Sequence, residues 1–273
     1  MAAIFIYGDE SGTMPIKQSD GPFVACCVAT LNEIPAFDAS DGKISWIFES
    51  LKEYDAIPHF SYVVPGIEFD DRFKSRMSKM NTMARMTRLM NGMNKQYLTE
   101  DGFCPRNYVW IRSMSTSIGQ VLVEKILRHR IDAINILLDQ KSFAIPNRHL
   151  FTKQIADIEK PLIRTLQRVR AVNPAAIQRV SRNVKFAGNI TIEWSDSPSV
   201  SASTGGLFLA DKLAGKFLRG LKSGQLASSP LVRKLGEYGF KDYSKDITKE
   251  FLELNKDAVE DWKRNTGLPE PQA

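Results

Sequence analysis

The alternation of apolar and polar residues along the chain predicts five β-strands. Runs rich in β-branched and aromatic residues, each bounded by turn residues, are typical of strands. Such runs occupy residues 4–7, 22–31, 59–64, 133–141 and 189–197. The first run is followed at once by Asp9, Glu10 and the turn residues Ser11 and Gly12. We expect the first two strands to pair as neighbours across this turn.

Apolar residues at helical spacing predict the helices. Amphipathic segments lie at 44–54, 114–130, 146–173, from 207 onward and at 247–262. A further helix at 70–97 has methionines every three or four residues among lysines and arginines. Two interpretations of this Met-rich helix stay open. Its methionine stripe packs against the sheet, or the helix is a mobile lid or partner-binding element whose basic face is available to phosphates.

Carboxylates recur where the predicted strands end. They are Asp9 and Glu10 after the first strand, Asp139 in the fourth and Asp196 in the fifth. Two more acids lie on predicted helices: Glu124 precedes the fourth strand, and Asp211 follows the apolar start of the helix from 207. A charge at the rim of a buried sheet needs a metal ion, a basic side chain or water as its partner.

Composition narrows the class of protein without selecting one. The chain has 273 residues, 43% hydrophobic and 25% charged, which is typical of a globular protein with a sizeable core. A formal charge of +6 and a pI of about 9.1 are compatible with a polyanionic partner. Three cysteines fit neither a disulfide framework nor a zinc site. No targeting leader or bilayer-spanning run is recognisable, so a reducing cytoplasm is expected.

Several catalytic signatures are missing from the sequence. It contains no G-x-S-x-G nucleophile elbow, no phosphate-binding Walker loop and no dinucleotide fingerprint. A serine hydrolase, a P-loop nucleotidase and a nicotinamide-dependent enzyme are therefore poorly supported.

The order of the predicted elements and acids resembles a ribonuclease H-like domain. Three motifs are also similar to the bacterial and phage family catalogued as domain of unknown function 3800: Asp9-Glu10-Ser11-Gly12, Asp196-Ser197 and Leu207-Phe208-Leu209-Ala210-Asp211. In that family a glutamine commonly precedes the Leu-Ala-Asp of the last motif, whereas Phe208 stands in its place here. The resemblance covers roughly residues 4–220.

This resemblance implies an α/β fold with a mixed five-stranded sheet flanked by helices. The ribonuclease H-like domain would span residues 1–222, with a Met-rich helical insertion at about 68–100. Residues 223–273 would form a helical C-terminal extension.

The resemblance also implies a site for divalent cations, Mg²⁺ or Mn²⁺, held by carboxylates. Asp9 would bridge two cations, while Asp139 and Asp211 would each bind one. The remaining candidates are Glu10 for catalysis and Asp196 and Glu124 as metal ligands. Plainer interpretations are that Asp9 and Asp139 cap turns, that Asp211 is favoured by a helix dipole, and that Glu124 lies on a solvated face.

Three other polar residues are candidates for contacts with substrate. Lys141 and Lys216 either bind phosphates or only compensate the acids. Ser11 either orients Asp9 through its hydroxyl group or only makes the turn.

Two functions are compatible with the sequence. The first is a Mg²⁺- or Mn²⁺-dependent nuclease that hydrolyses phosphodiester bonds of RNA or DNA, with Asp9, Glu10, Asp139 and Asp211 at its catalytic site. The second is a catalytically inactive nucleic-acid-binding or protein-interaction module, which the family alone would place in phage defence or a mobile element. No membrane is expected, and a protein partner or homo-oligomer is left open. Convergence of the carboxylates would distinguish the two functions.

Overall fold

The computed structural model describes residues 3–13, 21–35, 44–64, 98–99, 102–103, 105–129, 133–139, 190–195, 205–240 and 243–248. Several predictions fall outside these described residues. They are the Met-rich helix at 70–97, the helix at 146–173, most of the helix at 247–262, and the candidates Asp196 and Lys141.

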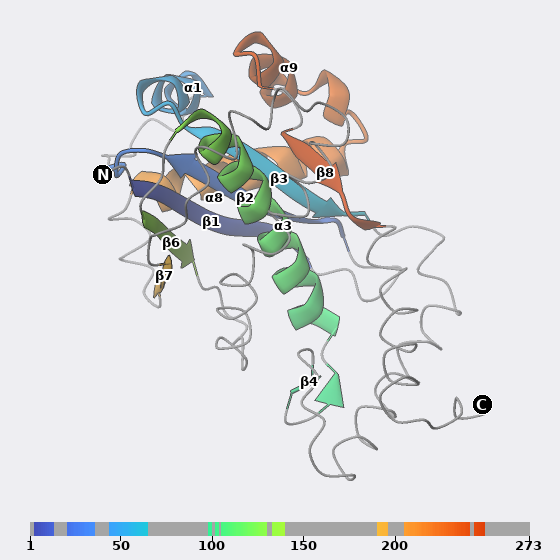
Figure 1. Cartoon of the computed structure of the whole chain (residues 1–273). Helices are drawn as coiled ribbons and strands as arrows, with labels where there is room; N and C mark the ends of the chain where they lie inside the picture. Colours follow the sequence, from blue (N-terminus) through green and yellow to red (C-terminus); the bar gives the residue numbers. More distant parts are fainter. Residues whose placement is uncertain are drawn as a thin grey trace, which may run out of the picture.

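A mixed sheet forms the centre of the described fold (Figure 1). Its strands are β1 (Ala3–Gly12), β2 (Phe23–Thr30), β3 (Ile57–Val63), β6 (Ala133–Asp139), β7 (Ile190–Ser195) and β8 (Ser244–Asp246). Their order across the sheet is β7-β6-β1-β2-β3-β8. The pairs β1–β2 and β2–β3 are antiparallel, whereas β1–β6, β6–β7 and β3–β8 are parallel. Two short strands, β4 (Leu98–Thr99) and β5 (Gly102–Phe103), form a separate ribbon.

All five predicted strands are present, and the predicted pairing of the first two is confirmed. The five lie in the order third, second, first, fourth, fifth, with the second antiparallel to the others. The predicted α/β class, a mixed sheet flanked by helices, is confirmed. The short strand β8 extends the sheet to six strands.

The first strand is longer than predicted. The acids were expected just after it, but β1 continues to Gly12 because its backbone pairs with β2 as far as Gly12 opposite Phe23. Asp9 and Glu10 therefore lie inside the strand and are 1% and 3% exposed. Gly12 ends the strand with a φ of 102°, which glycine adopts easily.

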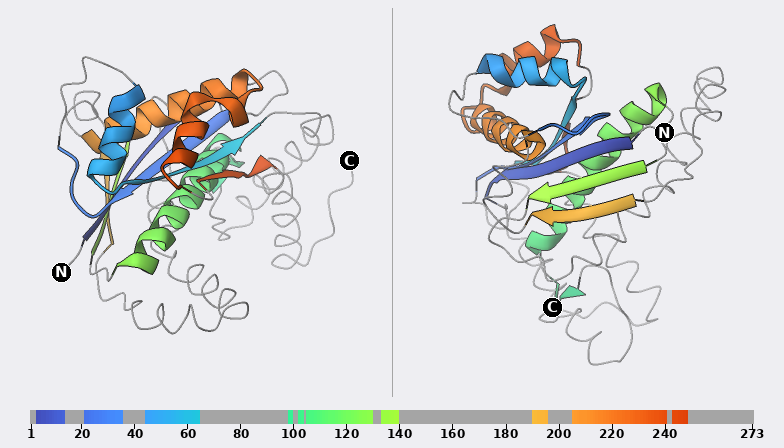
Figure 2. Two further views of the ribbon diagram at one scale, coloured as in Figure 1. Left: turned by 90° about the horizontal axis from the view of Figure 1, so that it is seen from above. Right: turned by 90° about the vertical axis from the view of Figure 1, so that its left-hand side faces the viewer.

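Helices cover both faces of the sheet (Figure 2). Helix α3 (Pro105–Arg128) lies on one face, while α8 (Gly205–Lys222) lies on the other. Helices α1 (Ile44–Glu53) and α9 (Pro230–Glu237) pack with α8 in one apolar core, and a 3-10 turn, η2 (Leu226–Ser228), joins α8 to α9. Helix α3 begins nine residues before its predicted start. Its first residue is Pro105, which suits the first turn because proline lacks the backbone N–H that would have no partner within the helix there.

Helix α8 lies very close to β1 at a glycine. A Cβ atom on Gly206 would overlap the ring of Tyr7, so only glycine allows this approach. The Tyr7 ring is buried, and its hydroxyl oxygen accepts a hydrogen bond from the backbone N–H of Ile34 at 3.1 Å. Burial raises the pKa of Tyr7 to about 12, so this hydroxyl stays protonated. The contact fixes the position of α8 along β1.

The chain after α8 joins the same sheet. Leu231 and Leu235 of α9 are buried against the α8 core. Strand β8 then pairs with β3, and the backbone N–H of Phe60 donates to the carbonyl of Tyr243 at 2.7 Å. The sequence predicted no strand here, because Ser-Lys-Asp has no apolar pattern and its pairing depends on tertiary contacts.

Candidate carboxylate site

Asp9 and Asp139 lie side by side on the neighbouring parallel strands β1 and β6. The register pairs Gly8 of β1 with Leu138 of β6, so Asp9 and Asp139 are the next residues on each strand. Neighbouring strands are about 4.8 Å apart, which sets the spacing of the two backbones. Both side chains are buried, with Asp139 8% exposed. Asp139 was predicted near the end of its strand and is the last residue of β6, whereas Asp9 lies inside β1.

Alternation along β1 sends Asp9 and Glu10 to opposite faces of the sheet. Asp9 shares its face with Tyr7, which packs in the α8 core. Glu10 shares its face with Gly8, next to Met114 of α3. The Trp110 indole N–H on α3 donates to Glu10 Oε2 at 3.0 Å. Glu10 is therefore directed away from Asp9 and toward α3.

Asp139 lies on the same face as Asp9. Leu137, two residues before it, packs against the α8 core together with Tyr7, its neighbour across the β1–β6 pair. Residues two apart on a strand share a face, so Asp139 is directed toward the α8 side. Ser11 likewise shares the face of Asp9, two residues further along β1.

Asp211 approaches this face from α8. It lies one helical turn after Leu207 and two turns before Leu218, on the stripe where Leu218 faces Gly12 of β1. The charges of both Asp9 and Asp211 act on the Cys26 thiol, which lies opposite Asp9 on β2. Burial is the largest cause of the raised pKa of Cys26, followed by Cys27 and then by the two aspartates.

Asp211 is much more accessible than the strand acids. Its side chain is 40% exposed, and its Oδ2 atom lies 3.0 Å from Lys212 Nζ in an ion pair. Lys212 Nζ also lies 4.6 Å from the centre of the Phe208 ring. Phe208 packs edge-on against Trp46 of α1. Its role in this chain is therefore packing and support of Lys212.

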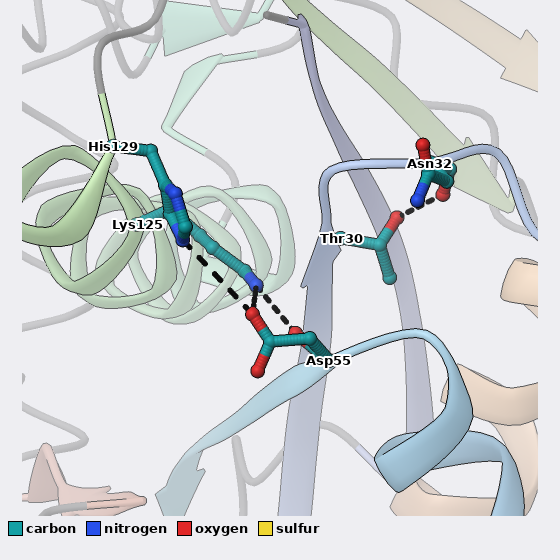
Figure 3. Close-up of polar contacts among 5 residues, drawn as sticks. All are labelled: Thr30, Asn32, Asp55, Lys125 and His129. Carbon is teal, nitrogen blue, oxygen red and sulfur yellow. Dashed lines mark hydrogen bonds and ion pairs between the residues drawn. The ribbon is translucent and has the colours of Figure 1, made fainter.

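The structure does not bring Glu124 to this site. Trp110 of α3 lies beside Glu10, and Glu124 follows it by 14 residues, or about 21 Å of helix. At that far end, buried Lys125 donates to the Asp55 carbonyl oxygen and, at 2.9 Å, to Asp55 Oδ2 (Figure 3). His129 Nε2 lies 4.0 Å from the same carboxylate oxygen. These contacts tie the end of α3 to the turn before β3, where Asp55 has a φ of 45°.

Glu124 lines a separate cavity of about 210 Å³. The cavity lies between α3, the start of β3 and the segment after α9. Its lining includes Asp55, His59, Tyr238 and Tyr243. Glu124 thus belongs to a different part of the fold from Asp9 and Asp139.

A buried histidine network was not recognised in the sequence. His59 Nδ1 lies 3.2 Å from Ser117 Oγ, and Ser117 Oγ donates to Ser61 Oγ at 2.9 Å. Burial, followed by the positive charge of Lys245, lowers the pKa of His59 to about 3. His59 is therefore neutral at neutral pH and serves the packing between α3 and the sheet. Only the tertiary contact with α3 reveals this network.

His59 makes a pH-dependent contribution to stability. Its folded-state pKa is lowered, so the unfolded chain binds more protons between pH 6.5 and about 3, and stability is lost as the pH falls through that window. The free energy of unfolding should fall by about 2 kcal/mol from pH 7.5 to pH 5 through His59 alone. Urea denaturation at both pH values measures this. In His59→Asn, this part of the pH dependence should disappear, and an unchanged pH dependence would contradict the assignment.

The buried pair of carboxylates fits Mg²⁺ or Mn²⁺. Both ions prefer oxygen ligands, and a buried carboxylate is favoured when a cation compensates its charge. Within the described ranges, no three His, Cys, Asp or Glu side chains form a group able to hold a metal ion by themselves. Mg²⁺ does not require such a group, because one or two carboxylates with water and substrate phosphate oxygens suffice. Asp9 and Asp139 would hold the ion, with Asp211 as the additional acid on this face.

Comparisons with known proteins add little to this geometry. No protein-family model matches the sequence, and no curated protein matches it. Among solved structures, a similar chain occurs in the structure of the PCNA:RNase HII complex from Archaeoglobus fulgidus. The two chains are 12% identical with a TM-score of 0.32, over 99% of this chain and 92% of that chain. Values this low do not establish a shared fold. In the described part of the chain, no helix is long and apolar enough to cross a membrane.

Proposed function

We propose that the chain is a divalent-metal-dependent nuclease that hydrolyses phosphodiester bonds of RNA or DNA. The observation that best supports this is the buried pair Asp9 and Asp139, which lie on adjacent parallel strands and share one face of the sheet. Asp211 of α8 borders the same face. Acids from three separate segments of the chain thus border one face of the sheet, although no three of the described acids form a metal-binding group by themselves. Substrate phosphate oxygens and water would complete the coordination of the ion.

Each acid has a distinct role in this proposal. Asp9 and Asp139 are fixed by strand backbones and by burial, so they would hold a cation with little rearrangement. Asp211 is half-exposed on a helix and would be the ligand that faces solvent and substrate. Bound Mg²⁺ or Mn²⁺ would activate water and stabilise charge on the attacking and leaving oxygens of a phosphodiester. Glu10 would act as a positioning residue through Trp110 rather than as a ligand.

The motif resemblance supports the same proposal. Asp9 belongs to the Asp-Glu-Ser-Gly motif and Asp211 to the Leu-Phe-Leu-Ala-Asp motif, which resemble those of domain of unknown function 3800. These motifs, about 200 residues apart in the sequence, lie on β1 and α8, which pack against each other.

Two observations favour the second function, an inactive nucleic-acid-binding or interaction module. Within the described residues, no three acids converge closely enough to hold a metal ion by themselves. The Asp211 carboxylate forms an ion pair with Lys212, so its charge is compensated without a metal. A module that has lost its metals could retain the fold in this way.

A cleavage assay distinguishes these functions. Labelled single- and double-stranded RNA and DNA are incubated with the full chain and Mg²⁺ or Mn²⁺, and parallel samples contain excess EDTA. The nuclease proposal predicts cutting of at least one substrate with metal and none with EDTA. Binding of nucleic acid without cutting under any metal condition would overturn the nuclease and support the inactive module.

A further inference from the structure

The outer face of α8 is strongly basic. The residues of this helix that are not buried are Phe208, Asp211, Lys212, Gly215, Lys216, Arg219, Leu221 and Lys222. Four of them are cations and only one is an acid. Lys212, Lys216 and Arg219 follow each other at spacings of four and three residues, so they lie along one side of the helix. We call these three residues with Gly215 and Lys222 the basic face of α8.

The cations of this face interact with one another. The pKa of Lys216 is lowered, first by partial burial and then by the positive charges of Arg219 and Lys212. Because like charges contribute to the lowered pKa of Lys216, the three cations are close enough to repel each other. A concentration of positive charge of this kind attracts polyanions and accelerates their association. The repulsion would be relieved by a bound chain of phosphates.

Gly215 is a position without a side chain within the basic face. A Cβ atom at Gly215 would meet nothing within 4 Å in the part of the chain that the structure describes, so no packing there requires glycine. Glycine in a helix interior costs about 0.5–1 kcal/mol relative to alanine. Asp211, Lys212 and Arg219 are its neighbours on the helix surface at spacings of four, three and four residues. Close approach of a partner backbone would explain a glycine that the fold itself does not need.

We propose that the basic face of α8 is the surface on which one strand of the nucleic-acid substrate lies. Lys212, Lys216 and Arg219 would bind its phosphates, and its backbone would run along the helix and pass over Gly215. From Lys212 to Lys222 the face is about 15 Å long, comparable to about four nucleotides of a B-form strand. Asp211 borders this face and the carboxylate site, so the strand would lead to Asp9 and Asp139. The identity of the ligand rests on the proposed nuclease function.

Binding measurements without cleavage test this surface. Fluorescence anisotropy with labelled single-stranded DNA and RNA in EDTA gives the affinity over a range of salt concentrations. The triple variant Lys212→Gln, Lys216→Gln, Arg219→Gln should bind at least about 10-fold more weakly, and its slope of log affinity against log salt should fall by about 2. A matched control is Lys52→Gln, Arg233→Gln, Lys234→Gln, which removes the same charge from exposed positions of α1 and α9.

Gly215→Leu separates binding from folding. Leucine is a better helix former than glycine, and the open space at Gly215 accommodates it, so thermal stability should rise. Affinity should nevertheless fall, because the side chain occupies the proposed path of the strand. A rise in stability with unchanged affinity would contradict the role of Gly215.

The results of the binding and cleavage experiments distinguish the proposed α8 binding surface from the proposed nuclease activity. If the wild type cuts nucleic acid but both triple variants bind it as the wild type does, the proposed binding surface on α8 is rejected and the proposed nuclease activity is supported. If only the α8 triple variant loses binding of nucleic acid and the wild type cuts none, the proposed binding surface is supported and the proposed nuclease activity is rejected. Equal weakening of both triple variants, or no binding by the wild type, would overturn the α8 surface.

Discussion

Replacing Asp9 with asparagine is expected to reduce metal-dependent cleavage by more than about 100-fold. Loss of groups that only support a metal ligand typically costs 10–100-fold, and Asp9 would be a ligand itself. Asparagine retains the shape of the side chain and removes its charge, so the fold should be preserved. Single-turnover cleavage with saturating Mg²⁺ measures the change, and circular dichroism checks the fold.

The adjacent residue provides the control for Asp9. Glu10 has the same charge and similar burial, but its carboxylate is directed to the opposite face and accepts a hydrogen bond from Trp110. Glu10→Gln retains an oxygen acceptor for the indole N–H, so we expect it to keep most of the activity. Equal loss of activity in Glu10→Gln and Asp9→Asn would contradict the assignment of ligand and positioning roles to the two faces.

Replacing Gly206 with alanine is expected to lower the free energy of unfolding by about 1–3 kcal/mol. The added Cβ would overlap the buried ring of Tyr7, whose hydroxyl is held by the backbone of Ile34. Helix α8 would have to move away from β1, and Asp211 would move with it. Chemical denaturation measures the stability, and the cleavage rate reports the displacement of Asp211.

A second glycine on the same helix serves as the control for Gly206. The added methyl group of Gly215→Ala meets no atom of the described residues, so this substitution should raise the free energy of unfolding by about 0.5–1 kcal/mol. Both substitutions replace glycine with alanine on the same helix. Opposite signs of the change in the free energy of unfolding would therefore be attributable to the contact of residue 206 with Tyr7. Stabilisation by both would show that α8 does not depend on close approach at Gly206.

The different roles proposed for Asp9 and Glu10 follow from the length of β1. If the strand ended at Tyr7, both acids would lie in a turn and could converge on one metal. Pairing with β2 through Gly12 keeps the backbone extended and sends the two carboxylates to opposite faces. The proposed site therefore combines acids from different segments, Asp9, Asp139 and Asp211, instead of two adjacent ones.

Strong local patterns made the five main strands predictable from sequence. The end of β1 was not, because Gly-Asp-Glu-Ser-Gly is typical of a turn and only its pairing with β2 makes it a strand. The early start of α3 was also missed, although Pro105 is a recognised helix-start residue. Its first turns carry Trp110, so the contact of Trp110 with Glu10, 100 residues away in the chain, could not be anticipated.

The candidate site was predictable where topology alone determines it. Asp139 ends β6, and parallel pairing of β6 with β1 brings it beside Asp9. Glu124 could not be placed from sequence, because its position depends on where along α3 the sheet makes contact. The structure puts it at the opposite end of the helix from Trp110.

Titration of the full chain with Mg²⁺ and Mn²⁺ by calorimetry tests the central claim most directly. The wild type is compared with the double variant Asp9→Asn, Asp139→Asn, with and without a non-cleavable nucleic-acid strand. We predict metal binding by the wild type that strengthens with the strand and is lost in the folded double variant. Equal binding by the two proteins, or no binding by a folded wild type even with the strand present, would contradict a metal site at Asp9 and Asp139.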